Sequence, residues 1–425
     1  MNILVIGSGG REHSICDKLK QSKSCDKLFV APGNPGIFQI AIKANISIDN
    51  NQDIINFCKS EEIDLVIIGP EQPLANGLTD VLQKHNINVF GPSKLAAKLE
   101  YSKGFAKEFM KQNNIPTAKF KQFNINNSDK AHNYIDNLKT KFVIKADGLA
   151  AGKGVIIPNS LDEAHKTIDN FNNGLFSSAG ENFVIEEFLD GEEASLFVIC
   201  DGEDYVILPP AQDHKRIFDN DKGLNTGGMG AIAPVGLITD EILHKIEKNI
   251  IIPLLANMKN DEMPFVGCLF IGLMICEKEP YVIEFNVRFG DPETQAVLRL
   301  INGDFAELLF SASKGKINKK SISIENGKYS CCVILASNGY PEKFEKGFEI
   351  DGINDSENNG AIVYHSGTSL INDKFITNGG RVLAVTSKEN SLETAISKVY
   401  EYCDLITFKN KYYRKDIGKK GLKYI

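Results

Sequence analysis

The sequence predicts a multidomain protein that combines an α/β N-terminal unit with α+β regions. Its length of 425 residues suggests roughly three domains. Over the first hundred residues, short apolar runs alternate with helical stretches, a pattern typical of a parallel, doubly wound sheet. Glycine- and proline-rich turns follow several of these runs, and in such sheets ligands bind beyond the carboxyl ends of the strands. We therefore expect a ligand site where the first strands end.

The composition excludes several classes of protein. With 42% hydrophobic and 24% charged residues the chain is an ordinary globular protein, and no apolar run approaches the ~20 residues that span a bilayer. The start, Met1–Gly7, lacks a basic region, so we expect no signal peptide and a cytoplasmic location. The net charge of −7 argues against a general nucleic-acid or membrane binder. The nine cysteines form no C-x-x-C pair, and we interpret them as buried small apolar residues.

The N-terminal elements follow from the alternation of apolar and helical segments. Strands are expected at 3–6, 28–30, 65–68 and 89–90, and helices at 12–22, 51–60 and 74–86. A further helix is expected from Ser93, a candidate N-cap after Pro92, to about residue 112. Gly104 is a candidate break in this helix.

The rest of the chain reads as an α+β region and a small third unit. Strands are expected at 142–146, 154–157, 183–188, 195–200, 205–209, 266–276 and 281–287, and helices at 160–173 and 239–259. Polar, glycine-rich loops occupy 212–230. The charged stretch 314–328 is interpreted as a linker, and the last hundred residues again alternate strand and helix.

The first turn, Gly7–His13, follows a strand and opens a helix, so its backbone N–H groups are suited to bind a phosphate. The dinucleotide pattern G-x-G-x-x-G fails, because Glu12 stands at the third glycine position. The second strand ends at Ala31 without the acidic residue that would bind a ribose. Phosphate binding without a nicotinamide is the favoured interpretation, and a purely structural tight turn is the alternative.

The segment 142–155 places Lys145 near the end of an apolar strand and Lys153 in a following glycine-rich loop. The spacing is not that of a Walker A loop, since Gly154 stands where Ser or Thr is required. Two cations and glycine amides still suit a polyphosphate. The alternative is a hairpin with solvated lysines. The acidic turn after the strand at 183–188 is a weaker candidate for binding a nucleoside, with a solvated turn as its alternative.

The strand at 281–289 carries the most informative pattern. Because side chains alternate along a strand, Glu284, Asn286 and Arg288 share one face while apolar residues occupy the other. Carboxylate and amide oxygens are ligands that Mg²⁺ accepts together with phosphate oxygens, and the guanidinium is suited to a further anion. A strand half-exposed to water is the alternative interpretation.

The loops 212–216 and 225–230 are rich in donors, acceptors and glycines, so they are suited to fold over a small polar substrate. An ordinary mobile loop is the alternative. No serine or cysteine nucleophile motif accompanies His214, which is therefore a substrate contact at most.

Together these segments resemble a known family. The motifs GSGGREH, APGNPG, GPEQPL, IKADGLAAGKGV, EEFLDGEEAS, QDHKR, NTGGMGA, EFNVRFGDPE and YRKDIG occur in order along the whole chain. They are similar to those of the phosphoribosylamine–glycine ligase (glycinamide ribonucleotide synthetase) family of the ATP-grasp superfamily. The resemblance implies an ATP-dependent ligation of glycine to 5-phosphoribosylamine through a glycyl phosphate, in de novo purine biosynthesis. ATP, with Mg²⁺ or Mn²⁺, is the implied cofactor.

The resemblance also implies roles for individual residues. The implied ATP-binding residues are Lys103, Lys145, Gly152, Lys153, Gly154, Glu186, Glu187, Leu189 and Glu193. Glu284 and Asn286 would bind the metal, while Lys145 and Arg288 would be catalytic. The preceding strand, 268–274, lacks the second acid that many ATP-grasp enzymes use, so the holder of a second metal is open. We hypothesise that the substrates contact Gly9, Gly10, Asn34, Glu71, Asp213, Lys215, Thr226, Gly227, Gly228, Met229, Gly230 and Arg288.

The implied organisation is an N-terminal Rossmann-like domain at 1–102, an ATP-grasp domain at 103–325 with a flexible lid at about 120–190, and a C-terminal domain at 326–425. The expected partners are the three small-molecule substrates, with no nucleic acid or membrane, and the protein is expected to be a monofunctional monomer. Lys103, Lys145, Lys153, Lys215 and Arg288 are predicted to converge on one cleft. The rival hypotheses are another ATP-grasp ligase or carboxylase, a nucleotide-binding protein without turnover, and a dehydrogenase, which Glu12 and Ala31 disfavour.

Overall fold

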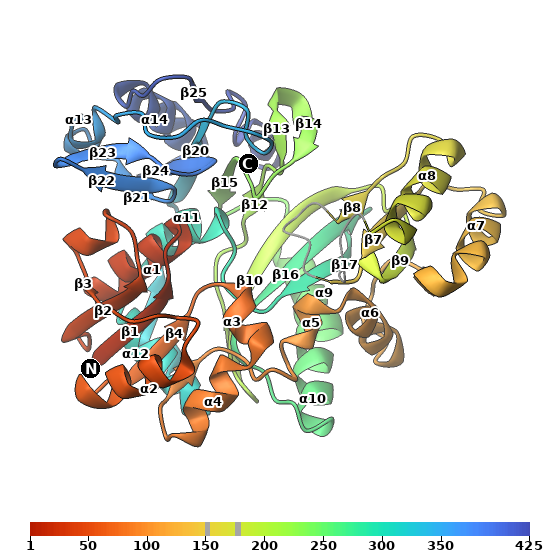
Figure 1. Ribbon diagram of the computed structural model, residues 1–425, viewed down its shortest axis with the longest axis horizontal. Helices are drawn as coiled ribbons and strands as arrows, with labels where there is room; N and C mark the ends of the chain where they lie inside the picture. The colour runs from red at the N-terminus through yellow and green to blue at the C-terminus, as the bar shows by residue number, and fades with distance from the viewer. Residues whose placement is uncertain (149–153, 175–179) are drawn as a thin grey trace.

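The structure is a computed structural model that describes residues 1–148, 154–174 and 180–425. Figure 1 shows an N-terminal unit in red and orange, a C-terminal unit in blue, and two further sheets in yellow, green and teal on the other side of the molecule. None of the helices in these residues is long and apolar enough to cross a membrane.

The N-terminal sheet is parallel and has the strand order β3-β2-β1-β4-β5. Its strands are β1 (Asn2–Gly7), β2 (Lys27–Pro32), β3 (Ile42–Lys43), β4 (Leu65–Ile68) and β5 (Val89–Phe90). Its helices are α1 (Gly10–Lys20), α2 (Asn51–Ser60), α3 (Glu71–Asn76) and α4 (Leu78–Lys84). The predicted doubly wound sheet is confirmed. The stretch predicted as one helix at 74–86 is two helices, because Gly77 has a left-handed backbone with a φ of 89°.

The chain then forms α5 (Lys98–Tyr101) and α6 (Lys103–Gln112). The break predicted at Gly104 lies instead at Ser102, whose hydroxyl accepts a hydrogen bond from the Phe105 amide at 3.2 Å and caps α6. Asp147 supplies a second cap, since its carboxylate accepts from the Gly104 amide at 2.7 Å. The cap ties the start of α6 to the end of the strand that carries Lys145.

The first antiparallel sheet has the order β6-β9-β7-β8. Its elements are β6 (Phe120–Asn124), α7 (Ser128–Asp136), β7 (Phe142–Ala146), β8 (Val155–Ile156), α8 (Leu161–Asn172) and β9 (Asn182–Glu187). Phe123, Phe171 and Phe183 belong to a core that this sheet shares with α7 and α8. In Figure 1 these elements form the outermost lobe. The predicted strands at 142–146 and 183–188 and the helix at 160–173 are confirmed to within two residues.

The second antiparallel sheet has the order β11-β10-β16-β17. Its strands are β10 (Glu192–Asp201), β11 (Tyr205–Ile207), β16 (Val266–Cys276) and β17 (Glu279–Asn286), and α9 (Asp240–Ile246) and α10 (Ile252–Asn260) precede β16. The two antiparallel sheets are joined through the segment before β6, because the Val282 amide donates to the Pro116 carbonyl at 2.8 Å. This connection brings β17 close to β7.

The C-terminal sheet is built from two distant parts of the sequence. Its main order is β12-β15-β20-β24-β21, and β25 pairs with β20. Its strands are β12 (Gln212–Asp213), β15 (Gly230–Ala233), β20 (Tyr329–Ser337), β21 (Ile362–His365), β24 (Arg381–Glu389) and β25 (Lys411–Tyr412). Its helices are α13 (Ile353–Asn358) and α14 (Leu392–Leu405). The loops at 212–230 are therefore anchored to this sheet, which extends across the predicted boundary at 326.

Shorter elements complete the fold. The helices α11 (Glu293–Val297) and α12 (Phe305–Ser313) pack on α1, which also contacts β21 of the C-terminal sheet. Three hairpins pair β13 (Arg216–Phe218) with β14 (Lys222–Asn225), β18 (Ile301–Gly303) with β19 (Ile322–Ile324), and β22 (Thr368–Ile371) with β23 (Lys374–Thr377). The stretch 314–328 is thus not wholly a linker, because β19 pairs with β18. Seven of the nine cysteines are buried and the other two are half-buried, as expected of small apolar residues.

Candidate active site

Predicted cations from four separate segments surround Glu284 on β17. Burial alone would raise the pKa of the Glu284 carboxyl, but Lys215, Lys145, Lys103 and Arg288 outweigh burial and lower it. Lys145 comes from β7, Lys103 from the first turn of α6, and Lys215 from the loop after β12. Lys153, predicted to join them, and Gly152 lie outside the described residues. Gly154 is described, and its carbonyl accepts from the Ala146 amide at 2.8 Å.

A buried ion triad lies beside this cluster. The Glu186 Oε2 atom is 2.7 Å from Lys107 Nζ and 3.0 Å from Lys145 Nζ, and all three side chains are buried. The Lys145 ammonium also donates to the Ile283 carbonyl on β17 at 3.3 Å. Glu186, predicted to contact ATP, therefore orients Lys145. Its second oxygen, Oε1, is buried and has no hydrogen-bond partner among the described residues.

Lys107 is a member of this triad that the sequence analysis missed. It follows Lys103 by one helical turn, so α6 presents both side chains on the same face. Burial lowers the pKa of Lys107 to about 8, although Glu186 opposes this effect. Its ammonium donates to Thr117 Oγ1 at 2.7 Å, and Thr117 in turn donates to the Val282 carbonyl at 2.7 Å. The i, i+4 spacing of two lysines was the signal that could have identified it.

The residues predicted to hold a metal suit that role. The Glu284 carboxylate makes no hydrogen bond or ion pair with another described residue, so its oxygens are available to a ligand. Asn286 shares the same face of β17, and its Oδ1 accepts from Arg288 at 3.3 Å. Opposite Glu284 lies Gly272, where an added Cβ would come within 3.1 Å of Glu284 Cγ. In the described chain no group of three acidic, His or Cys residues could hold a metal, so the pair would need oxygen ligands from a substrate.

Arg288 is held between two carboxylates. Its guanidinium is 2.9 Å from Glu100 and 3.3 Å from Glu71. Burial would lower the pKa of Arg288, but Glu100 and Glu71 raise it further above its ordinary value. Glu100, which the sequence analysis missed, also accepts from the Val287 amide at 2.8 Å and so fixes the strand end. The predicted contact residue Glu71 lies at the N-terminus of α3, and Arg288 thereby links the N-terminal unit to β17.

The loop after β12 carries a second charged cluster. Lys215 Nζ is 2.6 Å from Glu193 Oε2, so these two predicted residues lie together. Burial, with Glu193 and Glu284 nearby, raises the pKa of Asp213 despite the proximity of Lys215. Burial and the Asp213 carboxylate raise the pKa of Glu293 on α11 to about 8. Glu293 was not predicted, although it ends the motif EFNVRFGDPE. It brings a carboxyl group that is largely protonated at pH 7 to the cluster.

The loop 226–230 is held tightly against its surroundings. Thr226 Oγ1 donates to the Lys215 carbonyl at 2.8 Å and accepts from the Gly228 amide at 3.0 Å. Arg381 donates to the Gly227 carbonyl at 2.7 Å. Gly228 has a φ of 105° and packs on Pro292, where a side chain would clash. These contacts present Thr226 and Gly227 beside Lys215.

The prediction that Met229 contacts a substrate is not supported by its position. Its side chain is fully buried in the hydrophobic core, its amide donates to the His214 carbonyl at 2.8 Å, and its carbonyl accepts from Ile334. Gly230 is buried in β15, opposite Val333 of β20. His214 is also turned away, since its Nε2 accepts from the Gly418 amide at 3.2 Å. Both Met229 and His214 therefore support the loop from its buried side.

The first turn uses its own carboxylate as a cap. The Gly9 amide donates to Glu12 Oε2 at 2.7 Å, and Glu12 Oε1 is 2.5 Å from Arg11 Nε. Glu12 packs against Gly7 and leaves no room for a side chain there. Glu12, which stands at the third glycine position of the dinucleotide pattern, thus fills the space beside Gly7. The Gly9 amide, a predicted phosphate ligand, therefore has an internal acceptor.

The neighbouring predicted contacts Gly10 and Asn34 are also closely packed. A Cβ at Gly10 would lie 2.5 Å from the Ser366 hydroxyl. Asn34 Nδ2 donates to the Ser8 and His365 carbonyls, each at 2.8 Å. Its Oδ1 accepts from the Gly36 and Ile37 amides. Every donor and acceptor of the Asn34 side chain is thus engaged, and a substrate contact by this side chain stays a prediction.

The segment predicted to bind adenine joins β9 to β10. The Glu187 amide donates to the Lys119 carbonyl at 2.9 Å, and its carboxylate accepts from the Lys119 amide at 3.0 Å. Leu189 follows in the connection and is half-buried. The segment begins directly after Glu186, so it lies next to the ion triad that contains Lys145.

The C-terminal motif YRKDIG fixes the hairpin β13–β14. Arg414 is fully buried and forms a two-pronged pair with Asp416, with both N–O distances at 2.7 Å. Its guanidinium also contacts Asp221 at 3.0 Å and donates to the Arg216 carbonyl at 3.0 Å. Arg216 directly follows Lys215. Arg414, about 200 residues further along the chain, therefore helps to fix the position of the charged cluster.

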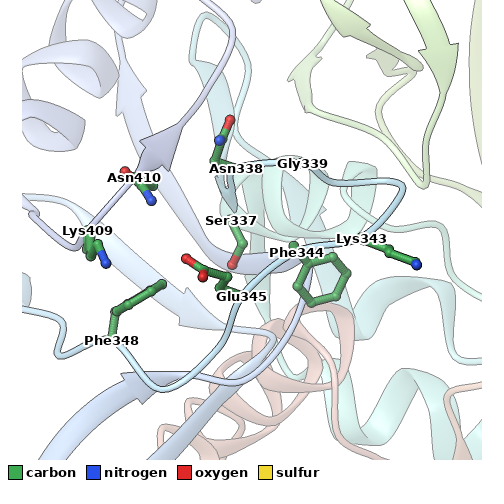
Figure 2. A pocket seen from close by; sticks show the side chains of 9 residues that line it. All are labelled: Ser337, Asn338, Gly339, Lys343, Phe344, Glu345, Phe348, Lys409 and Asn410. Carbon is green, nitrogen blue, oxygen red and sulfur yellow. The ribbon is translucent and has the colours of Figure 1, made fainter.

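A separate cavity of about 310 Å³ lies in the C-terminal unit. Figure 2 shows it between Phe344 and Glu345 on one side and Lys409 and Asn410 on the other. None of the predicted site residues lines it. The candidate active site is instead the cluster around Glu284.

Comparisons with known proteins agree with this architecture. Sequence profiles of the phosphoribosylglycinamide synthetase N domain, ATP-grasp (A) domain and C domain match residues 1–100, 101–294 and 330–420. The phosphoribosylamine–glycine ligase of Fusobacterium nucleatum is 46% identical over 98% of each chain. A bifunctional purine biosynthetic protein of Pichia angusta is 45% identical over 100% of this chain and 54% of its own length, so this chain spans about half of such relatives.

Solved structures give the same result. The crystal structure of phosphoribosylamine–glycine ligase from Thermotoga maritima has a TM-score of 0.85 and 32% identity, covering 98% of this chain and 100% of that one. A biotin carboxylase of Campylobacter jejuni has a TM-score of 0.71 at 14% identity, with coverage of 96% and 92%, and shares the fold alone. The full-length identity, the ordered domain matches and the sheet arrangement show that the chain belongs to the phosphoribosylglycinamide synthetase family.

Proposed function

We propose that the chain catalyses the ATP-dependent ligation of glycine to 5-phosphoribosylamine, giving glycinamide ribonucleotide, ADP and phosphate in de novo purine biosynthesis. Membership of the family supports this activity, and full-length relatives from Fusobacterium nucleatum, Clostridium acetobutylicum and Neisseria meningitidis carry the name phosphoribosylamine–glycine ligase. The observation that carries the proposal is the group of four cations around Glu284. Such a cluster is suited to a triphosphate and a carboxylate that must approach each other.

Joining a carboxylate to an amine in water requires activation of the carboxylate. A glycine carboxylate oxygen attacks the γ-phosphorus of ATP, the bond to the ADP oxygen breaks, and glycyl phosphate forms. The amine nitrogen of phosphoribosylamine then attacks the acyl carbon, phosphate leaves, and the nitrogen loses a proton. Lys145, Lys103 and Lys215 neutralise the transferring phosphoryl group. This route requires no covalent enzyme nucleophile.

Individual residues take distinct parts in this proposal. Lys145 and Arg288 act on the reacting groups, with Lys145 oriented by Glu186 and Arg288 by Glu71 and Glu100. The proposed nucleotide contacts are Lys103, Gly152, Lys153, Gly154, Glu186, Glu187, Leu189 and Glu193. The proposed substrate contacts are Gly9, Gly10, Asn34, Glu71, Asp213, Lys215, Thr226, Gly227, Gly228, Gly230 and Arg288.

Glu284 and Asn286 are the proposed metal ligands. When bound, Mg²⁺ or Mn²⁺ would balance the charge of the ATP phosphates. The free carboxylate oxygens of Glu284 support this role. The proposal also includes a cytoplasmic monomer with domains at 1–102, 103–325 and 326–425, and a closing lid at about 120–190 that excludes water from glycyl phosphate.

Coupled measurement of ADP release tests the activity. We expect ADP formation only when ATP, glycine and phosphoribosylamine are all present, with a product of the mass of glycinamide ribonucleotide. Omission of glycine should abolish ADP release. ADP formation that does not depend on glycine would reject this substrate assignment in favour of another ATP-grasp reaction.

A further inference from the structure

A small cavity lies away from the candidate active site, where three parts of the chain meet. Its volume is about 80 Å³. It is lined by Asp17 and Lys18 of α1, by Arg299 and Asn302 near β18, and by Tyr364 and Lys388 of the C-terminal sheet. Lys18 is eight residues beyond Gly10 along α1, which corresponds to about 12 Å at ~1.5 Å per residue. The cavity therefore lies at the opposite end of α1 from the first turn.

The lining carries an excess of positive charge. Lys18, Arg299 and Lys388 contribute three cations, and Asp17 is the one carboxylate in the lining. Both Asp17 oxygens are already engaged, since the Tyr364 hydroxyl donates to Oδ2 at 3.1 Å and Gln21 donates to Oδ1 at 3.2 Å. Lys388 pairs with Glu325 outside the cavity at 2.6 Å. The charge facing the cavity is thus incompletely balanced by the protein.

Arg299 has no partner among the described residues. Its guanidinium makes no hydrogen bond or ion pair there, and its Nε atom is buried without an acceptor. The Asn302 amide likewise has no side-chain hydrogen bond within the described chain. Lys18 is only 8% exposed and has a single side-chain acceptor, Gln21 Oε1 at 3.2 Å.

These cations also repel one another. Burial lowers the pKa of Lys18, and Lys388 and Arg299 add to this effect while Asp17 and Glu325 oppose it. A buried donor without an acceptor is unfavourable, and a buried charge without a partner more so. An anion in the cavity would supply the missing acceptors and reduce the repulsion.

We propose that this cavity binds a small oxyanion of the size of phosphate or sulfate. The planar guanidinium of Arg299 is suited to bidentate binding of such an anion, and the Lys18 and Lys388 ammonium groups supply further charge. A volume of about 80 Å³ is well below the ~300 Å³ at which pockets for larger organic ligands begin, so a nucleotide does not fit. The anion would connect α1 with β21 and β24. This site is independent of the proposed ligase activity.

Calorimetric titration of the full chain with sodium sulfate tests this proposal. Sodium chloride at equal ionic strength is the reference, because screening alone changes with salt. We expect saturable sulfate binding that becomes about tenfold weaker or more in Arg299→Met, since the variant loses a charge-assisted contact to the anion. Lys20→Met is the matched control, because Lys20 is exposed on the same helix and should leave the affinity unchanged.

Two further arms separate this cavity from the candidate active site. Lys145→Met, which alters the active site, should retain sulfate binding, and inorganic phosphate should compete with sulfate whereas AMP should not. A crystal soaked in selenate should show anomalous density within hydrogen-bond distance of the Arg299 guanidinium. Equal sulfate affinity in wild type and Arg299→Met, displacement by AMP, or no selenate at Arg299 would each overturn the proposal.

Discussion

Two carboxylates in motifs with predicted ligand contacts, Glu12 and Glu284, have opposite environments. Glu12 accepts from the Gly9 amide and pairs with Arg11, so its oxygens are engaged within the first turn. The Glu284 carboxylate makes no hydrogen bond with another described residue, although four cations lie close enough to lower its pKa. Both residues belong to motifs that predicted ligand binding. The comparison indicates a rule for such motifs. A carboxylate without hydrogen-bond partners inside the protein marks a reactive site, whereas a carboxylate whose oxygens are bound by the protein has a structural role.

The largest effect is expected from changing the open carboxylate. Glu284→Gln removes the charge that is proposed to hold the metal but keeps the volume, so ATP should still bind while kcat falls about a thousandfold, in the range for loss of one electrostatic group. Turnover is measured by coupled ADP release, and ATP binding by calorimetry. Glu279→Gln, exposed on the same strand, is the control. Turnover within about threefold of wild type in Glu284→Gln would refute the metal role.

The second prediction concerns the first turn and the residues packed on it, where we expect an effect on the free energy of unfolding. Burial lowers the pKa of His13 to about 3, with His365 adding to the effect, and burial lowers the pKa of His365 to about 4. The His365 amide donates to His13 Nδ1 at 2.8 Å, a contact that requires a neutral ring. Below pH 6.5 the unfolded chain binds protons that the folded chain excludes, so stability present above pH 6.5 is lost as the pH falls. Each histidine contributes about 1.4 kcal/mol per pH unit.

Urea denaturation between pH 7.5 and 5.5 measures this loss before most carboxylates titrate. The midpoint should fall steadily below pH 6.5, and less steeply in His365→Gln than in wild type. His85→Gln provides the control, because His85 is exposed. A midpoint that is independent of pH over this range would contradict the buried, neutral state of His13 and His365.

A third prediction concerns the ion triad. Its carboxylate, Glu186, is intermediate between Glu284 and Glu12, because one of its oxygens is paired and the other has no partner among the described residues. Because burial lowers the pKa of Lys107 to about 8, the ammonium loses its proton above that pH. Lys145 is then the one remaining cation of the triad. Glu186 therefore holds the Lys145 ammonium more strongly and weakens its contact with the ATP phosphates. KM for ATP should therefore rise about tenfold between pH 7.5 and 9.5, as expected for a weakened charged hydrogen bond.

Arginine at this position separates the effect of charge from that of packing. Lys107→Arg stays charged at high pH, so its KM for ATP should remain flat to pH 9.5 even if its value is altered. Lys111→Arg, exposed on the same helix, should keep the wild-type pH profile. The same alkaline rise in Lys107→Arg and in wild type would show that another group titrates.

The sequence predicted the parts of the fold that local patterns encode. The alternating apolar runs of the N-terminal unit correctly indicated a parallel sheet, and the alternation along β17 correctly placed Glu284 and Asn286 on one face. The family resemblance is confirmed by full-length relatives. The break in the predicted helix was misplaced, because the cap on Gly104 comes from Asp147, 43 residues further along the chain.

Contacts between distant segments explain the other misses. Met229 was grouped with a polar loop, yet its side chain lies in the core, directly before β15. Glu100 and Glu293 acquire their partners only when α5 and α11 pack beside Arg288 and Asp213. Contacts between residues of different segments cannot be predicted from the periodicity within one segment. The roles of the individual site residues accordingly remain predictions that the variants described here can test.

The smallest effect is expected from Glu12, and it provides the sharpest test of the comparison. Glu12→Gln keeps one acceptor for the Gly9 amide but removes the charge that pairs with Arg11, so stability should fall by about 1–2 kcal/mol. Its kcat at a temperature where the variant is folded should fall less than tenfold. Thermal unfolding and ADP release measure the two quantities, with Asp26→Asn as an exposed control. A kcat loss like that of Glu284→Gln without loss of stability would place Glu12 among the reactive groups, and internal engagement would no longer distinguish a structural carboxylate from a catalytic one.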